Sequence, residues 1–215
     1  MESNYDSILE EKKIILHGHF VLNSWLHTDR YFDKDKILLQ PKARSYFSGE
    51  LVKKIEKRGI PSIDVMMGPA YAGSVLGNET ARIWSETNYS VLNPFTEKIP
   101  ESKKTDVSRF QEYLEGKGIF LIDDVLTSGD SLLDMILQLR KIPGVKILGA
   151  AVLCNRNNVT TKQLGDIPIL ISLMNPDLPS WPHKDCKLCK DNLIPVNQKK
   201  GRGKAFMEGK APRDT

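Results

Sequence analysis

The chain has 215 residues, of which 40% are hydrophobic and 27% are charged, a composition typical of soluble globular proteins. Its formal net charge of +4 is confined to the C-terminal end, because six basic and two acidic residues lie between Asn197 and Thr215. The length fits one α/β domain with a small addition, and the neutral body argues against a nucleic-acid-binding surface.

The sequence has no segment that resembles a targeting or membrane signal. Four acidic residues precede any apolar run, namely Glu2, Asp6, Glu10 and Glu11, which is unlike a signal peptide. No apolar stretch reaches the length needed to cross a membrane. Three cysteines, an odd number, argue against a disulfide framework. We therefore expect a cytoplasmic protein with reduced thiols.

The hydrophobic pattern predicts helices and strands that alternate through the middle of the chain. In chain order we expect a helix over 5–16, a short hairpin over 18–38, a helix over 41–58, a strand over 62–67 with a Gly-rich turn and helix after it, a strand over 89–93, a mobile polar loop over 94–108, a strand over 119–122, a helix through 139, and strands over 145–153 and 167–174. This order predicts an α/β fold with a mostly parallel sheet flanked by helices.

The segment 118–133, GIFLIDDVLTSGDSLL, carries most of the functional signal. An apolar run ends in two adjacent carboxylates, Asp123 and Asp124, and a loop of small and polar residues leads into the next helix. Ligands bind at the carboxyl ends of strands in open α/β sheets, and N–H groups at a helix start suit a phosphate. The carboxylates repel phosphate, so they should face ribose hydroxyls or Mg²⁺. A phosphosugar meets both requirements; the alternative is a buried strand and a capped helix without a ligand.

The run FLIDDVLTSGDS resembles the phosphoribosyl-pyrophosphate (PRPP) signature of type I phosphoribosyltransferases. The resemblance implies that Asp123 and Asp124 contact the ribose and the Mg²⁺ carried with PRPP, and that Asp124 takes part in catalysis. The residues implied to enclose the 5′-phosphate are Thr127, Ser128, Gly129, Asp130 and Ser131. Asp130 departs from the family pattern. A carboxylate at this position is unfavourable beside a phosphate unless its side chain points outward.

Two further segments resemble PRPP-binding parts of the same family. GPAYAG resembles the loop of orotate phosphoribosyltransferases that touches pyrophosphate, which implies contacts from Ala70, Tyr71, Ala72 and Gly73. Some relatives carry Lys at the position of Ala72. The segment 94–108 corresponds to a flexible loop that closes over PRPP, with Lys98 as a PRPP contact and Lys103 or Lys104 as the catalytic lysine. The alternative is a surface loop that merely contains lysines.

The expected base-binding residues come from both ends of the chain. GHFVLNSWLHTDRY resembles part of the base-binding hood of orotate phosphoribosyltransferases, which implies roles for Ser24, His27 and Tyr31, with Trp25 where the family usually has Gly. Arg156 matches an arginine that pairs with the orotate carboxylate in relatives, and the planar guanidinium suits that role. The alternative for the first segment is a plain hydrophobic hairpin, and the alternative for Arg156 is a surface arginine.

An HxxCxxC cluster lies near the C-terminal end. His183, Cys186 and Cys189 supply an imidazole and two thiols, three of the four ligands of a structural zinc site, but no fourth ligand is evident nearby. We favour a structural element without metal, and zinc is the alternative.

The resemblance implies a type I phosphoribosyltransferase fold in four parts: a hood segment over 1–40, a PRPP-binding α/β core over 41–175, a second hood element over 176–196 and a disordered basic tail over 197–215. It implies a homodimer that transfers the phosphoribosyl group from PRPP to orotate with Mg²⁺, without membrane or nucleic-acid partners. The alternatives are transfer to another base such as a purine, a non-catalytic PRPP-sensing regulator, and a hydrolase, for which the sequence shows no nucleophile elbow or metal-ligand set.

Overall fold

The computed structural model describes residues 13–60, 62–99, 105–191 and 194–211, which divide into two compact units. The terminal unit combines Met1–Asp33 with Asp177–Thr215, and the α/β unit comprises Lys34–Pro176. The borders predicted at residues 40 and 175 lie close to these limits. The short helix α2 (Asp35–Leu38) packs on α3 (Pro41–Glu56) and therefore belongs to the α/β unit.

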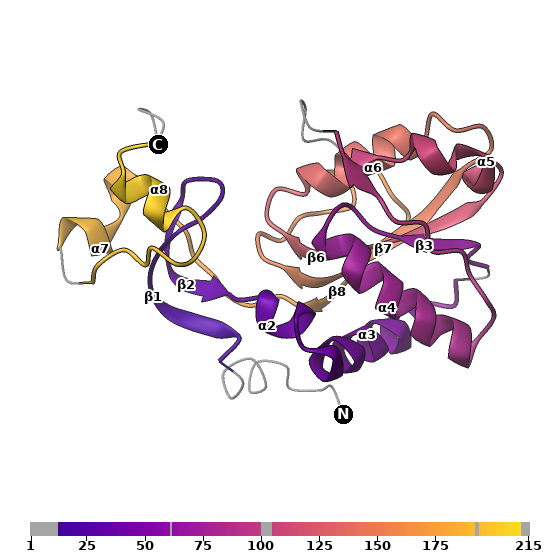
Figure 1. Ribbon diagram of the computed structural model, residues 1–215, viewed down its shortest axis with the longest axis horizontal. Helices are drawn as coiled ribbons and strands as arrows, with labels where there is room; N and C mark the ends of the chain where they lie inside the picture. The colour runs from indigo at the N-terminus through magenta and orange to yellow at the C-terminus, as the bar shows by residue number, and fades with distance from the viewer. Residues whose placement is uncertain (1–12, 61, 100–104, 192–193, 212–215) are drawn as a thin grey trace. The chain divides into compact units, whose positions relative to one another are not determined.

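A four-stranded parallel sheet forms the centre of the α/β unit, which confirms the predicted fold class. Its strands run in the order β3 (Val65–Met67), β6 (Gly118–Leu126), β7 (Lys146–Asn155) and β8 (Leu170–Met174). Helix α6 (Asp130–Leu139) covers one face, while α3 and α4 (Ala72–Thr87) cover the other (Figure 1). Because both faces are covered, these strands are apolar along most of their length.

Strand β6 is the buried centre of this sheet. Ile119 and Leu121 belong to the hydrophobic core that also holds the buried side chains of α6. Side chains alternate along a strand, so the buried residues Phe120 and Ile122 face the layer of α3 and α4. The two layers hold β6 from both sides, and this fixes the position of its last residues.

The predicted mobile loop is framed by two short strands. β4 (Glu97–Lys98) and β5 (Thr105–Asp106) pair antiparallel, and the turn η1 (Ser108–Phe110) and α5 (Gln111–Leu114) follow. Residues 100–104 lie outside the described part of the chain.

The strand predicted over 89–93 is reduced to a single bridge between Leu92 and Val65. The pairing does not extend further because the next donor to Met66 O would be residue 94, and Pro94 has no backbone N–H. The side-chain amide of Asn93 donates to Met66 O instead, at 2.6 Å.

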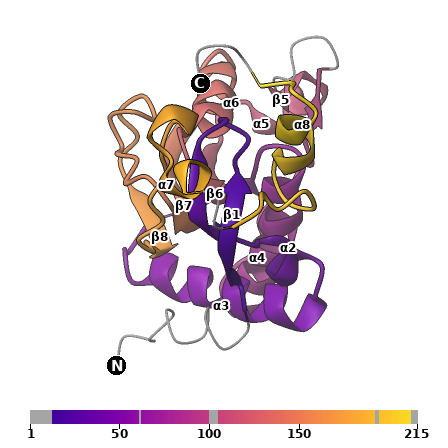
Figure 2. The same cartoon turned by 90° about the vertical axis from the view of Figure 1, so that its left-hand side faces the viewer.

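The terminal unit is built on the predicted hairpin, formed by β1 (Ile15–Val21) and β2 (His27–Phe32). Three short helical segments come from the other end of the chain: η2 (His183–Asp185), α7 (Lys187–Lys190) and α8 (Gly203–Met207). Figure 2 shows α7 and α8 beside the hairpin. Ile15 and Leu16 lie in β1, so the helix predicted over 5–16 is wrong there, and residues 5–12 lie outside the described part.

Part of the segment predicted to be a disordered tail is folded. Arg202 donates its backbone N–H to Val21 O at 2.8 Å and its Nε–H to Asn23 O at 3.0 Å. Gly201 allows this close contact, because a Cβ there would lie 2.2 Å from Val21 O. Lys200 Nζ pairs with Asp33 Oδ1 at 2.8 Å. The composition suggested disorder, whereas the same Gly and basic residues make specific contacts with the hairpin.

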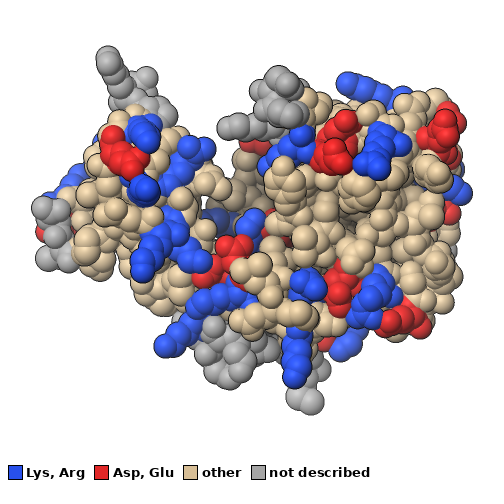
Figure 3. All heavy atoms as spheres, in the orientation of Figure 1, with Lys and Arg blue, Asp and Glu red and all other residues tan. Residues whose placement is uncertain are grey.

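Charged side chains of both signs share the visible surface of the α/β unit (Figure 3), in agreement with the neutral charge of the body of the chain. Lys and Arg side chains are interspersed with Asp and Glu over the visible face of the α/β unit (Figure 3). None of the helices that the structure describes is both long enough and apolar enough to cross a bilayer.

The residue after β3 tests how closely the backbone of this sheet is packed. A Cβ on Gly68 would lie 2.0 Å from Ile122 O, so Gly68→Ala should lower the free energy of unfolding by about 1–3 kcal/mol. Gly49→Ala, in α3 where an added Cβ meets nothing within 4 Å, is the matched control and should raise it by about 0.5–1 kcal/mol. Urea unfolding measures both variants, and equal effects would contradict the close packing at Gly68.

Candidate active site

The carboxyl end of β6 carries the acidic pair that the sequence singles out. Asp123 and Asp124 are each only 5% exposed, although carboxylates are rarely buried without a partner. Asp123 Oδ1 accepts the backbone N–H of Asp124 at 2.8 Å. Asp124 forms an ion pair with Lys34 Nζ. The strand end therefore holds two buried acids and one adjacent cation.

Burial and neighbouring charges shift the pKa values of Asp123 and Lys34. Burial, followed by repulsion from Asp124, raises the pKa of Asp123 well above its usual range, while Lys34 acts in the opposite direction. Burial alone would lower the pKa of Lys34, but its attraction to Asp124 and Asp123 holds that pKa above the usual value, so Lys34 stays charged at neutral pH. An occupant that brings hydrogen-bond donors or positive charge would relieve the repulsion between the two carboxylates.

Lys34 is a site residue that the sequence analysis missed. It precedes α2 in the stretch DKDKIL, where acidic and basic residues alternate and no spacing distinguishes one lysine from another. Only the packing of α2 in the α/β unit brings Lys34 to the end of β6.

The predicted phosphate loop connects β6 to α6. Gly129 has a φ of 84°, in the left-handed region, and a Cβ there would lie 2.9 Å from Leu164 Cδ2. Gly129 is also the N-cap of α6, and no side chain caps the first turn. The N–H groups that begin a helix lack partners within the helix, so this turn can bind an anion.

The other members of this loop lie at its rim. Ser128, Asp130 and Ser131 are exposed, and Thr127 is half-buried. The Ser128 hydroxyl donates to Asp130 Oδ2 at 2.7 Å. The departure at Asp130 therefore gives the loop an exposed carboxylate that is hydrogen-bonded to Ser128.

The predicted pyrophosphate loop meets the acidic pair. It leaves β3 at Gly68 and enters α4, whose first residues are Ala72 and Gly73. A Cβ on Gly73 would lie 2.9 Å from Asp123 Oδ1, so only glycine allows the loop this close to the carboxylate. The hydroxyls of Ser74 and Thr96 donate to Gly68 O at 3.0 and 2.8 Å and hold the start of the loop.

The lysines of the predicted mobile loop are only partly described. Lys98 Nζ lies 5.7 Å from the ring centre of Tyr71, which is 71% exposed, whereas Ala70 is buried. Lys103 and Lys104 lie outside the described residues, so their role in catalysis stays a prediction.

Arg156 follows β7 at the same edge of the sheet. Its backbone N–H donates to Leu126 O at 2.9 Å, which extends the pairing of β6 and β7 beyond the last strand residue. The residue is 8% exposed. Asn155 fixes the turn that follows, because its side chain exchanges two hydrogen bonds of 2.8 Å with the backbone of Val159.

The hairpin residues predicted to contact the base lie in the terminal unit. Ser24 is exposed in the hairpin turn, and Tyr31 is half-buried with its ring 5.3 Å from that of Phe20. Trp25 has a φ of 67°, a conformation that favours glycine, which gives a physical reason for Gly at this position in the family. The roles of Ser24 and Tyr31 as base contacts stay predictions.

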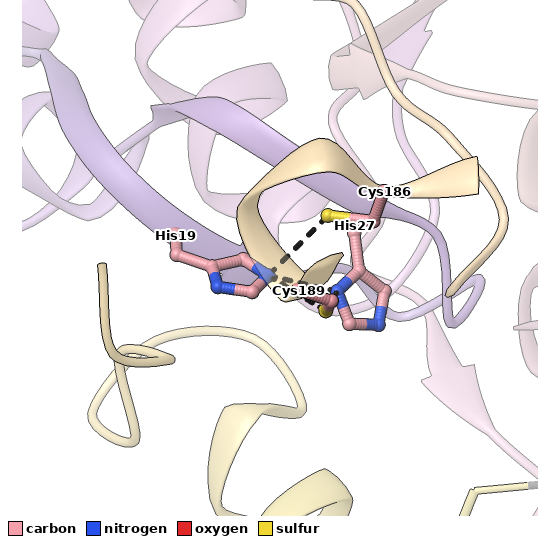
Figure 4. Close-up of side chains that lie close together, drawn as sticks. All are labelled: His19, His27, Cys186 and Cys189. Carbon is pink, nitrogen blue, oxygen red and sulfur yellow. Dashed lines mark hydrogen bonds between the residues drawn. The ribbon is translucent and has the colours of Figure 1, made fainter. Parts of the chain in front are cut away.

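His27 has different neighbours from those predicted. It is fully buried, and its Nδ1 forms one group with His19 Nε2 and the sulfurs of Cys186 and Cys189, in which all four atoms lie within 4.8 Å of one another (Figure 4). His27 thus belongs to this cluster, and its role in base binding stays a prediction.

The cluster contains the two cysteines of the predicted metal trio but not its histidine. His183 is outside the group, and its ring packs against that of His27 with centroids 5.1 Å apart. The histidines of the cluster were missed because His19 and Cys186 are 167 positions apart in the sequence.

The raised pKa of Asp123 predicts how the stability of the ligand-free protein depends on pH. The folded state binds more protons than the unfolded state between the unfolded and folded pKa values, so the free energy of unfolding should fall as the pH rises through that range. Asp123→Asn removes this loss and should be more stable than the wild type at neutral pH, with a smaller difference near about pH 4.

Urea unfolding at a series of pH values measures this effect, and Asp106→Asn is a control of opposite sign. Asp106 accepts the Ser108 N–H at 2.8 Å, which lowers the pKa of its carboxyl, so its replacement should reduce stability at neutral pH. A wild-type profile no steeper than that of Asp123→Asn would contradict a raised pKa of Asp123.

Comparison with known proteins identifies the family. Residues 48–167 match the family model of the phosphoribosyl transferase domain, a span that contains both loops, the acidic pair and Arg156. The orotate phosphoribosyltransferase of Nitratiruptor sp. is 27% identical over 201 residues, covering 89% of this chain and 95% of that protein. That of Caldanaerobacter subterraneus is 29% identical over 189 residues, covering 86% of this chain and 90% of that protein.

Solved structures agree in fold. Orotate phosphoribosyltransferase from Francisella tularensis superposes with a TM-score of 0.58 at 20% identity, covering 80% of this chain and 85% of that one. Adenine phosphoribosyltransferase from Thermoanaerobacter pseudethanolicus gives 0.57 at 20% identity, covering 78% and 99%. Together with the family match, these findings establish that the chain belongs to the phosphoribosyltransferase family and is a transferase of that kind.

Proposed function

We propose that this phosphoribosyltransferase transfers the 5-phosphoribosyl group from PRPP to orotate, giving orotidine 5′-monophosphate and pyrophosphate in pyrimidine biosynthesis. The observation that carries the proposal is the convergence of the acidic pair, the two loops and Arg156 at one edge of the sheet. The orotate phosphoribosyltransferases of Nitratiruptor sp. and Caldanaerobacter subterraneus, of which this chain covers 95% and 90%, support the choice of orotate.

The phosphoribosyl donor would be held by groups of complementary charge. Asp123 and Asp124 accept hydrogen bonds from the ribose hydroxyls, which gives the buried carboxylates donors in addition to the Asp124 N–H and Lys34. The start of α6 at Gly129 binds the 5′-phosphate through backbone N–H groups. The start of α4, at Ala72 and Gly73, offers the same kind of group to the pyrophosphate.

The donor set at this edge fits Mg²⁺, which prefers carboxylate, phosphate and water oxygens. Asp123 and Asp124 are the residues that would hold it, together with the oxygens of PRPP. Bound there, Mg²⁺ would offset negative charge on the departing pyrophosphate. Lys34 already offsets part of the charge of Asp124 through their ion pair.

The reaction asks little covalent chemistry of the protein. A ring nitrogen of the base attacks C1 of the ribose while the bond to pyrophosphate breaks, and the protein contributes position and electrostatic stabilisation. We assign Lys98 to the pyrophosphate side and Lys103 or Lys104 to the leaving group, on a loop that would exclude water. We further propose a cytoplasmic homodimer, as the family resemblance implies.

A second candidate substrate is a purine base. The solved adenine phosphoribosyltransferase matches this fold about as well as the orotate enzyme does, so the fold does not discriminate between bases. Arg156 does discriminate, because a guanidinium buried at the sheet edge suits the carboxylate of orotate and has no such partner on adenine.

A substrate panel tests the proposal. Pyrophosphate release is followed with PRPP and Mg²⁺ in the presence of orotate, uracil, hypoxanthine or adenine. Turnover with orotate alone is the expected result. Turnover with hypoxanthine or adenine would replace the proposed base, and PRPP binding without turnover on any base would identify a regulator.

Replacing Arg156 tests its role separately. Arg156→Ala should raise the KM for orotate about 10- to 100-fold, because a charge-assisted hydrogen bond contributes about 1.5–3 kcal/mol, and should leave the KM for PRPP nearly unchanged. Arg140→Ala is the matched control, since Arg140 is exposed at the end of α6. Equal KM values for orotate in the Arg156 variant and the wild type would rule out this carboxylate contact.

A further inference from the structure

We propose that His19, His27, Cys186 and Cys189 form a structural zinc site in the terminal unit. The four side chains offer two imidazole nitrogens and two sulfurs, the donor set that tetrahedral zinc prefers. Figure 4 shows them pointing toward one another from the hairpin and from the turn at α7. The site is independent of the chemistry proposed for the α/β unit.

The separations of the donor atoms match a tetrahedral metal. Zinc bonds of about 2.3 Å to sulfur and about 2.0 Å to nitrogen place the sulfur and nitrogen ligands about 3.5 Å from each other. His19 Nε2 lies 3.6 Å from Cys186 Sγ and 3.5 Å from Cys189 Sγ. Cys189 Sγ lies 3.3 Å from His27 Nδ1. The two nitrogens are 2.9 Å apart, so binding a metal requires them to separate by only a few tenths of an ångström.

The protonation of His19 suits metal binding. Its Nδ1 lies 3.0 Å from Ile194 O, and a carbonyl oxygen can only accept, so Nδ1 carries the proton. In the neutral ring this leaves the lone pair on Nε2, the atom that faces the cluster. A ligating histidine whose other nitrogen donates to a backbone carbonyl is the usual arrangement at zinc sites.

Backbone hydrogen bonds bring the ligands together across the sequence. His27 and Trp181 exchange backbone bonds of 2.7 and 2.8 Å, which fixes the segment that leads to Cys186. Asn197 N–H donates to His19 O at 2.7 Å, which fixes the segment that follows Cys189. These backbone bonds therefore hold the segments on both sides of α7 against the hairpin that carries the two histidines.

The burial of the donors indicates a structural site. His19, His27 and Cys186 are nearly inaccessible, and Cys189 is half-buried, so no open coordination position faces solvent. Structural zinc sites are closed in this way, whereas catalytic ones keep a position for water or substrate.

The terminal unit also needs such a cross-link. Its core is small, and the buried hydrophobic residues that the structure describes there are Ile14, Ile15, Phe20, Val21, Leu22, Phe32, Leu178 and Cys186. Units of fewer than about 80 residues commonly add a metal or disulfides to a core of this size. The cluster joins β1 and β2 to the segment around α7.

Metal analysis of the full chain tests the site. Protein expressed with zinc in the medium and purified without chelator should contain about one zinc per chain by mass spectrometry of the metal. Cys189→Ser and His19→Ala should lose it. Two matched controls should keep it: Cys154→Ser, a buried thiol of β7, and His183→Ala, whose ring touches His27 but is not a ligand.

Two measurements on the wild-type protein keep the test decisive if a ligand variant fails to fold: the visible spectrum after cobalt substitution, and mass spectrometry that detects whether the cysteines are reduced. Wild-type protein produced with Co²⁺ should show the intense visible bands of tetrahedral cobalt and a thiolate-to-cobalt charge-transfer band. Wild-type protein free of zinc that also gives no cobalt spectrum would overturn the proposal. Zinc retained by Cys189→Ser, or a Cys186–Cys189 disulfide found by mass in protein purified under reducing conditions, would overturn it as well.

Discussion

The burial of two adjacent carboxylates at the end of β6 is the constraint on which the arrangement of the α/β unit depends. Hydrophobic layers on both faces of β6 hold Asp123 and Asp124 away from water, and α2 supplies Lys34 as a partial counter-charge. The backbone of the neighbouring loop can reach Asp123 only because residue 73 is glycine. The unit thus stores unfavourable electrostatic energy in the ligand-free state, and a ligand with hydroxyl groups and accompanying positive charge relieves it.

The terminal unit differs from the α/β unit in the size of its core and in the polar groups that are buried there. The α/β unit has a large apolar core that holds two buried carboxylates in place. The terminal unit has a small apolar core, and four metal-ligating side chains lie close together in it. Four donors at one point are unfavourable unless they are satisfied, and zinc would satisfy them together. Buried polar groups thus form the proposed substrate site in one unit and the proposed metal site in the other.

The sequence predicted features that depend on neighbours along the chain. The parallel sheet, the hairpin and the loop ending at Gly129 follow local patterns of apolar residues and turn residues, and the structure contains them. Contacts between distant segments were not predictable in this way. Lys34 looks like any surface lysine, the zinc cluster joins His19 to Cys186 across most of the chain, and the basic segment after 197 looked disordered although Arg202 bonds to β1. In each case tertiary packing, and not local pattern, decides the partner.

Calorimetric titration of the full chain with PRPP in the presence of Mg²⁺ tests most directly whether the acidic pair binds the phosphoribosyl donor. Asp124→Asn keeps the shape of the side chain and removes its charge, and Asp35→Asn changes an exposed carboxylate next to Lys34. The account predicts that the wild type and Asp35→Asn bind PRPP alike and that Asp124→Asn binds it about tenfold more weakly or worse. Equal affinity in all three proteins would contradict it.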